Sequence, residues 1–196
     1  FREAISNSVD AGANRISICV EFREDGLQNI VVEDNGHGIL YNPDDEEMDG
    51  IGAFWSIAKS VKAHAQRAIG EKGLGSKTYL RAEHVSVTSY NGENHLFSEM
   101  DDPLVSLQNG EIPEYQPDDP VTDSGTSGLQ QPGTIVRIKG VRISSLNPNG
   151  SAESNALKLR DYIHWKTAGG TFKNKFNHLQ YLHEEVPNIY VIPNIE

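Results

Sequence analysis

The chain is short of cysteine and of long apolar runs. A single cysteine, Cys19, excludes a framework of internal disulfide bonds and fits a reducing compartment, so we expect a cytoplasmic, intracellular protein. No apolar run reaches the length of a membrane-spanning helix, and no signal-peptide pattern is present. We therefore expect no association with a membrane.

Positive charge is also scarce, because 28 Asp and Glu residues outnumber 17 Lys and Arg residues and the formal net charge is −11. A DNA-binding domain usually carries a basic patch, and none is evident here. We predict that this domain does not bind nucleic acid directly. The seven His residues lack the spacing of metal ligands, so we also predict no zinc site.

Three polar or glycine-rich motifs follow one another in the first part of the chain. The first lies on a predicted helix over residues 1–11, where Glu3, Asn7 and Asp10 share one face and apolar residues occupy the opposite face. Oxygen atoms of this kind suit one Mg²⁺ ion, and a carboxylate can polarise an attacking water. The alternative is an amphipathic surface helix with a solvated polar face.

The second motif follows a short β-branched run, Ile30–Glu33, which we predict to be a strand. The run leads into Asp34, and the glycines Gly36 and Gly38 come next. Asp34 can accept a hydrogen bond from an exocyclic amine such as that of adenine, and glycine lets the backbone approach a ligand closely. The alternative is an ordinary Asp-Asn-Gly turn.

The third motif, at residues 70–77, spaces its glycines as G-x-x-G-x-G, which differs from a Walker motif. It leads into a predicted helix over residues 73–82. Backbone N–H groups at a helix start bind anions, so we predict phosphate contacts along this loop. The residues concerned are Lys72, Gly73, Leu74, Gly75, Ser76 and Lys77. The alternative is a flexible loop between two helices.

In this order, the three motifs resemble the GHKL ATPase superfamily, whose members include DNA gyrase B, the ninety-kilodalton heat-shock chaperone, MutL and the sensor histidine kinases. The segment Asn7–Ala13 is similar to MutL, whereas Ile57–Ser60 and Val85–Ser89 are more like the chaperone. Gly133–Thr134, before a predicted strand, resembles the last pocket motif of the family. The resemblance covers about residues 1–140.

The resemblance implies a role for each residue of the first motif. Glu3 would be the general base that activates water, Asn7 would bind Mg²⁺ through its amide oxygen, and Asp10 would support the pocket near the nucleotide. In the other motifs, Asp34 would bind the adenine amine. Thr134 would close the adenine side through its hydroxyl.

The two glycine motifs take complementary roles by the same resemblance. Gly36 and Gly38 belong to the nucleotide pocket, with Gly38 lining the base, and the glycines of the third motif would form the lid hinge and phosphate cradle. The chain also departs from its relatives. The MutL lid motif Gly-Phe-Arg-Gly-Glu is absent, and the stretch over residues 60–69 is short for a chaperone lid. The cation that many relatives supply to the γ-phosphate from a following domain is not identifiable.

We predict an α/β fold, a two-layer sandwich with a mixed sheet, helices on one face and an ATP lid. Residues 1–145 would form the ATP-binding core without its N-terminal start. Residues 146–196 would be an extension of the same domain, leading to a missing following domain. The predicted elements are a hairpin of Arg15–Phe22 with Leu27–Glu33, a helix over 48–60, a lid over 61–72, a hairpin of His84–Tyr90 with His95–Met100, a small hairpin around Asn109–Gly110, a strand Thr134–Lys139 and a helix over 152–167 capped by Ser151.

The function expected from this resemblance is binding and hydrolysis of Mg-ATP, which would drive a conformational or dimerisation cycle in a larger protein. Its partners would be ATP, a second copy of the chain and further domains of the same polypeptide. One alternative is a nucleotide-binding switch that does not hydrolyse, against which Glu3 argues. Another is a protein histidine kinase, against which Asp10 argues, because those kinases usually carry a different residue there. We expect residues 61–77 to become ordered when nucleotide binds.

Overall fold

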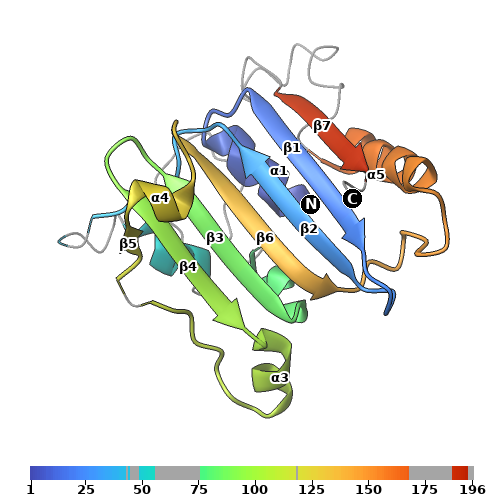
Figure 1. Ribbon diagram of the computed structural model, residues 1–196, viewed down its shortest axis with the longest axis horizontal. Helices are drawn as coiled ribbons and strands as arrows, with labels where there is room; N and C mark the ends of the chain where they lie inside the picture. The colour runs from blue at the N-terminus through green and yellow to red at the C-terminus, as the bar shows by residue number, and fades with distance from the viewer. Residues whose placement is uncertain (43, 45–48, 56–75, 118, 168–186, 194–196) are drawn as a thin grey trace.

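The computed structural model describes residues 1–42, 44, 49–55, 76–117, 119–167 and 187–193. Their elements surround one seven-stranded sheet with the strand order β5-β4-β3-β6-β2-β1-β7 (Figure 1). In chain order they are α1 (Arg2–Asp10), β1 (Arg15–Phe22), β2 (Gln28–Asp34), α2 (Gly50–Trp55), η3 (Ser76–Arg81), β3 (His84–Tyr90), β4 (His95–Asp101), α3 (Pro103–Gln108), β5 (Val121–Thr122), α4 (Ser124–Ser127), β6 (Gly133–Val141), α5 (Ala152–Lys166) and β7 (Asn188–Pro193).

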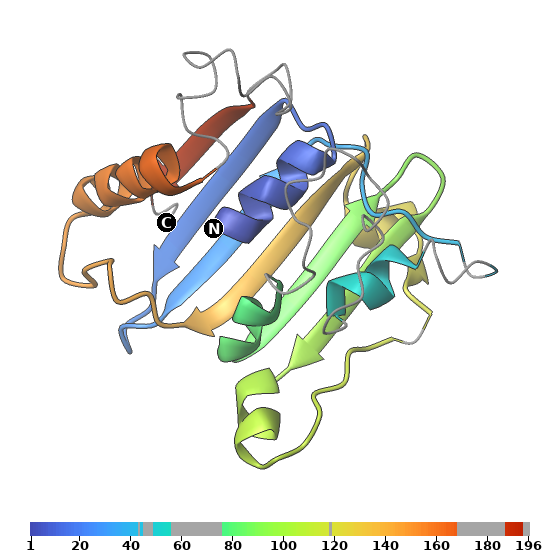
Figure 2. The same cartoon turned by 180° about the vertical axis from the view of Figure 1, so that it is seen from behind.

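The sheet is mixed, because β7 runs parallel to β1 while the other described neighbours are antiparallel. Figure 2 shows α1, α2, η3 and α5 on one face of this sheet. The predicted two-layer α/β sandwich with a mixed sheet is therefore confirmed. The predicted lid over residues 61–72 lies outside the described residues.

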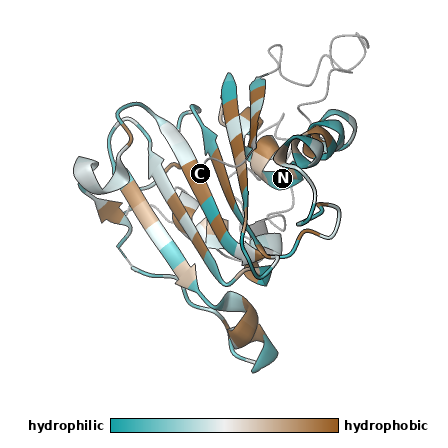
Figure 3. Cartoon of the chain, turned by 45° about the vertical axis from the view of Figure 1, so that its right-hand side comes forward, coloured by the Kyte–Doolittle hydropathy of each residue, from teal (hydrophilic) through white to brown (hydrophobic). Residues whose placement is uncertain are grey.

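The alternating side chains of the strands explain which face the helices cover. On β1, Ile16, Ile18 and Val20 are buried, and the residues between them are more exposed. Hydropathy alternates along the strands in the same way (Figure 3). Successive side chains of a strand point to opposite faces, so one face supplies the core and the other remains partly in solvent.

Helix α1 covers the centre of the sheet with the face predicted to be apolar. Ile5 and Val9 are buried in the core. Glu3, Asn7 and Asp10 are half-buried. The polar face of the helix therefore lies neither in the core nor fully in bulk water. A binding face would need this setting.

Both main hairpins form in the predicted places. β1 pairs with β2, and β3 pairs with β4, each antiparallel. The predicted strand after Gly133 is present as β6. The predicted helix over 152–167 is present as α5, where the Ser151 hydroxyl accepts a hydrogen bond from the N–H of Ser154 at 3.1 Å.

One local prediction was wrong. Asn109–Gly110 does not turn a hairpin but ends helix α3, where Gly110 has φ = +77°. Asn-Gly serves both structures, because a helix C-terminus and a tight turn each need a residue with positive φ. The helix predicted over 73–82 is present in the described residues from Ser76 to Arg81, as a 3₁₀ helix. Of the predicted helix over 48–60, the structure describes α2.

A buried glutamine, Gln28, fastens the start of β2 to the segment that follows β6. Its side chain is 1% exposed. It donates to the carbonyl of Gly26 at 2.7 Å and accepts from the N–H of Ile143 at 2.7 Å. Both ends of the amide are therefore used, and the two segments are held in register.

We predict that Gln28→Leu lowers the free energy of unfolding by about 1–3 kcal/mol, the usual cost of a buried polar group left unpaired. The apolar side chain leaves the N–H of Ile143 without its acceptor. Urea denaturation measures the effect. Gln108→Leu, at an exposed position of α3, is the control and should change stability by less than about 0.5 kcal/mol. Equal stabilities of the two variants would contradict this role for Gln28.

Candidate functional site

The first two motifs meet at the carboxyl end of β2. The carboxylate of Asp34 accepts a hydrogen bond from the Ser8 hydroxyl at 2.7 Å and another from the backbone N–H of Gly36 at 2.9 Å. Ser8 lies on α1, so the first bond joins the helix to the sheet, and the second shapes the turn after the strand. The structure thus brings together two segments that the sequence separates by more than twenty residues.

The Asp34 carboxyl group is half-buried, and its partial removal from water disfavours the charged form. Burial raises its pKa above the ordinary value of 3.8, while hydrogen bonds from Gly36, Ser8 and the backbone of Thr134 act in the opposite direction. The net direction is upward because desolvation of a charged group outweighs these bonds. Asp34 therefore offers an acceptor that the fold partly strips of water, which suits recognition of a hydrogen-bond donor.

The glycines of the second motif are required by close packing. Gly38 has φ = +78°, and a Cβ atom there would overlap the backbone carbonyl of Tyr90. A Cβ atom at Gly36 would lie 2.7 Å from that of Ala11. The turn consequently sits tightly between α1 and β3. Asn35, which the sequence analysis missed as a site residue, anchors it by accepting from the N–H of Arg15 at 2.8 Å.

A serine on β3 connects the second motif with the last one. The Ser89 hydroxyl accepts from the N–H of Ile39 at 2.8 Å and donates to the carbonyl of Gly133 at 2.9 Å. Its oxygen also lies 3.2 Å from the hydroxyl oxygen of Thr134. Thr134 pairs with Asp34 across β6 and β2. Thr134 is therefore placed beside Asp34.

The predicted catalytic and metal-binding residues Glu3, Asn7 and Asp10 share the half-buried face of α1. Within the described residues, no group of three or more His, Cys, Asp or Glu side chains is arranged to hold a metal ion. A Mg²⁺ ion bound with phosphates needs few protein ligands, because it keeps several waters. The single amide of Asn7 fits that need, so it remains our candidate ligand.

A buried tyrosine lies near Glu3, and no sequence pattern pointed to it. Tyr79 of η3 is 4% exposed, and among the described residues its hydroxyl has no hydrogen-bond partner. Burial, and then the negative charge of Glu3, raise its pKa above the ordinary value of 10. Its ring centroid lies 6.1 Å from that of Phe54 on α2. Tyr79 thus links the region after the third motif with the start of α1.

The third motif is described only at its end. Lys72, Gly73, Leu74 and Gly75 lie outside the described residues. Ser76 and Lys77 form the first turn of η3, and their side chains are not described. The predicted phosphate contacts of these six residues therefore stay predictions.

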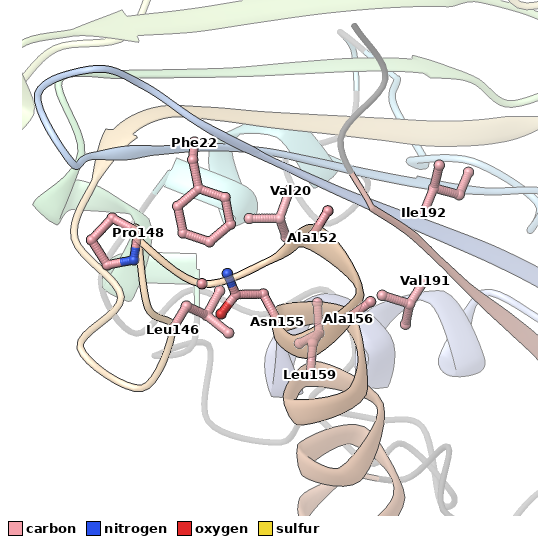
Figure 4. A pocket seen from close by; sticks show the side chains of 11 residues that line it. Val20, Phe22, Leu146, Pro148, Ala152, Asn155, Ala156, Leu159, Val191 and Ile192 are labelled. Carbon is pink, nitrogen blue, oxygen red and sulfur yellow. The ribbon is translucent and has the colours of Figure 1, made fainter.

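A separate apolar cavity lies between α5, β1 and β7, with Leu146, Leu159 and Val191 in its wall (Figure 4). Asn155 also lines it, and its amide is engaged with the backbone N–H and carbonyl of Asn147 at 2.9 Å and 2.7 Å. No charged side chain is among the residues that line it. This lining has no charged group for an anionic ligand, and the predicted site residues lie elsewhere, around Asp34.

The structure is a two-layer α/β domain with a half-buried polar site at the end of β2. The chain matches the family model of histidine kinase-, DNA gyrase B- and HSP90-like ATPases over residues 1–123. It belongs to this family, and it is a GHKL-type ATP-binding domain. A comparison with curated proteins found no match. None of the described helices is long and apolar enough to cross a membrane.

We predict that Tyr79→Phe raises the free energy of unfolding of the nucleotide-free protein by about 1–3 kcal/mol. The change keeps the ring but removes a buried hydroxyl that has no partner among the described residues, and such a group costs about that much. Urea denaturation, with the slope checked for constancy, measures the gain. Tyr190→Phe, on the exposed side of β7, is the matched control. A loss of stability in Tyr79→Phe alone would show that the hydroxyl is satisfied.

Proposed function

We propose that the chain binds Mg-ATP and hydrolyses it, and that hydrolysis drives a conformational or dimerisation cycle in a larger protein. The observation that carries the proposal is the hydrogen bond from Ser8 to Asp34 at 2.7 Å. It fixes the adenine acceptor to the same helix that carries Glu3 and Asn7. Family membership supports the ATP-binding part of the proposal.

In this proposal the described residues have separate roles. The Asp34 carboxylate accepts a hydrogen bond from the adenine 6-amino group. The amide oxygen of Asn7 is the protein ligand of Mg²⁺, which supplies neutralisation of phosphate charge when bound. Asp10 supports the pocket near the nucleotide from the same face of α1.

Glu3 supplies the general base. Its carboxylate takes a proton from water while the water oxygen forms a bond to the γ-phosphorus. The bond from that phosphorus to the β–γ bridging oxygen breaks, and ADP and inorganic phosphate leave. Glu3 then returns its proton to solvent. The half-buried position of Glu3 favours this role, because the carboxylate is neither sealed in the core nor fully solvated.

The remaining expectations extend the proposal beyond the described residues. Lys72, Gly73, Leu74, Gly75, Ser76 and Lys77 would contact the phosphates and belong to the ATP lid. Residues 146–196 would extend the core of residues 1–145 towards a following domain. A nucleotide-dependent homodimer and a cytoplasmic location complete the proposal. The non-hydrolysing switch is the second candidate, and the turnover of the Glu3 variant decides between the two.

We predict that Glu3→Ala leaves ATP affinity nearly unchanged and lowers turnover by about 10²–10⁴-fold, the usual range for loss of a general base. Phosphate release by the longer protein, together with calorimetric titration of ATP, measures both quantities. Glu153→Ala is the matched control, since Glu153 is also an acidic residue in the first turn of a helix. Asn7→Ala should instead reduce both affinity and turnover. Wild-type turnover in Glu3→Ala would leave the switch as the better interpretation.

We predict that Asp34→Asn weakens ATP binding by about 1–3 kcal/mol, because a buried charge-assisted hydrogen bond is lost. Calorimetric titration measures this loss, with Asp161→Asn on the exposed face of α5 as the control. Unchanged affinity in Asp34→Asn would reduce Asp34 to a turn residue.

The same variant should be more stable than the wild type at neutral pH without nucleotide. The raised pKa of Asp34 means that the unfolded carboxyl group gives up its proton at lower pH than the folded one. This group therefore stabilises the fold below the ordinary pKa of 3.8 and loses that contribution as pH rises through the folded value. The advantage of Asp34→Asn should disappear below that ordinary value. A variant that is destabilised at neutral pH would show that its binding defect comes from the fold.

A further inference from the structure

Ser89 occupies a position that the proposed chemistry does not use. It is 0% exposed, yet its hydroxyl touches three groups of the candidate site. Those groups are the N–H of Ile39 at 2.8 Å, the carbonyl of Gly133 at 2.9 Å and the hydroxyl of Thr134 at 3.2 Å. Ser89 lies on β3, next to the strand that carries Thr134, and is too deeply buried to contact a nucleotide itself.

The number of protons on the hydroxyl groups limits which group donates in each hydrogen bond of this cluster. A serine hydroxyl has one proton to donate and two lone pairs to accept with. The carbonyl of Gly133 can only accept and lies nearer to Ser89, at 2.9 Å, than the Thr134 hydroxyl at 3.2 Å, so we assign the Ser89 proton to this carbonyl. The N–H of Ile39 can only donate, so it occupies one lone pair. With that assignment the remaining lone pair of Ser89 faces Thr134, whose hydroxyl then donates to Ser89.

This direction leaves the Thr134 oxygen with lone pairs and no free proton. Thr134 is half-buried and stands opposite Asp34 in the pairing of β6 with β2. The carboxylate of Asp34 is likewise an acceptor when ionised. Two acceptors side by side select a ligand edge that donates hydrogen bonds and disfavour one that presents a carbonyl oxygen.

We propose that Ser89 is a specificity-determining residue, which holds Thr134 as an acceptor and thereby favours a 6-amino purine over a 6-oxo purine. The proposal rests on the proposed nucleotide function, because it assumes that the base lies against Asp34 and Thr134. Adenine carries the amine that this edge needs. Hypoxanthine and guanine carry an oxygen at the same position, which meets lone pairs on both sides.

The test compares ATP with inosine triphosphate, which replaces the 6-amino group by oxygen and adds nothing at position 2. Isothermal titration gives both affinities for the wild type and for Ser89→Ala. Without Ser89, the Thr134 hydroxyl is free to rotate and to donate. We expect ATP affinity to fall about 3- to 10-fold, the effect of one neutral hydrogen bond. Affinity for inosine triphosphate should stay or rise, so the preference for ATP shrinks.

Ser98→Ala is the matched control. Ser98 is also a fully buried serine, lies one strand away on β4, and accepts a hydrogen bond from Trp55 Nε1 at 2.9 Å. Its loss should change stability and leave the ratio of the two affinities at the wild-type value. Ser89→Cys, which keeps the size of the side chain, replaces Ser89→Ala if thermal unfolding shows that the alanine variant does not fold.

A double-mutant cycle separates polarity from packing. Thr134→Val removes the hydroxyl, so adding Ser89→Ala to it should leave the affinity ratio unchanged. If Ser89→Ala lowers both affinities equally, or if it changes the ratio equally with and without Thr134, the proposal for Ser89 is overturned while ATP binding stands. If the wild type binds neither nucleotide, the proposed function itself fails.

Discussion

The hydrogen bond between Ser8 and the half-buried carboxylate of Asp34 organises the candidate site of this domain. A carboxylate in a desolvated place is costly unless donors surround it, and here α1, the turn after β2 and the backbone of β6 each supply one. Each donor belongs to a different segment. The requirement to satisfy one charge therefore places three segments relative to one another.

Under the proposed function, the electrostatic cost that remains at Asp34 would have a counterpart in ligand binding. Its pKa stays above the ordinary value despite three donors, so the carboxylate retains capacity to accept from a ligand. A fold optimised only for stability would replace it with a neutral residue. Stability given up at a binding position is common in proteins that must hold a polar ligand, and a 6-amino group would restore part of it.

The sequence predicted the parts of the structure that local rules determine. The polar face of α1, the hairpin of β1 with β2 and the Ser151 cap follow from periodicity and capping chemistry. Asn109–Gly110 was misread, because the same dipeptide suits a hairpin and a helix end. Ser89 and Tyr79 were missed as site residues, since their importance depends on partners brought by other strands and helices. No spacing along the chain encodes such contacts.

Helix α1 also sets a length scale for the site. Ser8, which holds Asp34, and Glu3, the proposed base, are five residues apart, which is about 7.5 Å along a helix axis at 1.5 Å per residue. Glu3 lies in the first turn of α1, and its charge acts on buried Tyr79 of η3. Because one helix carries both residues, a shift of η3 would change the surroundings of Glu3 without moving Ser8 and its contact with Asp34.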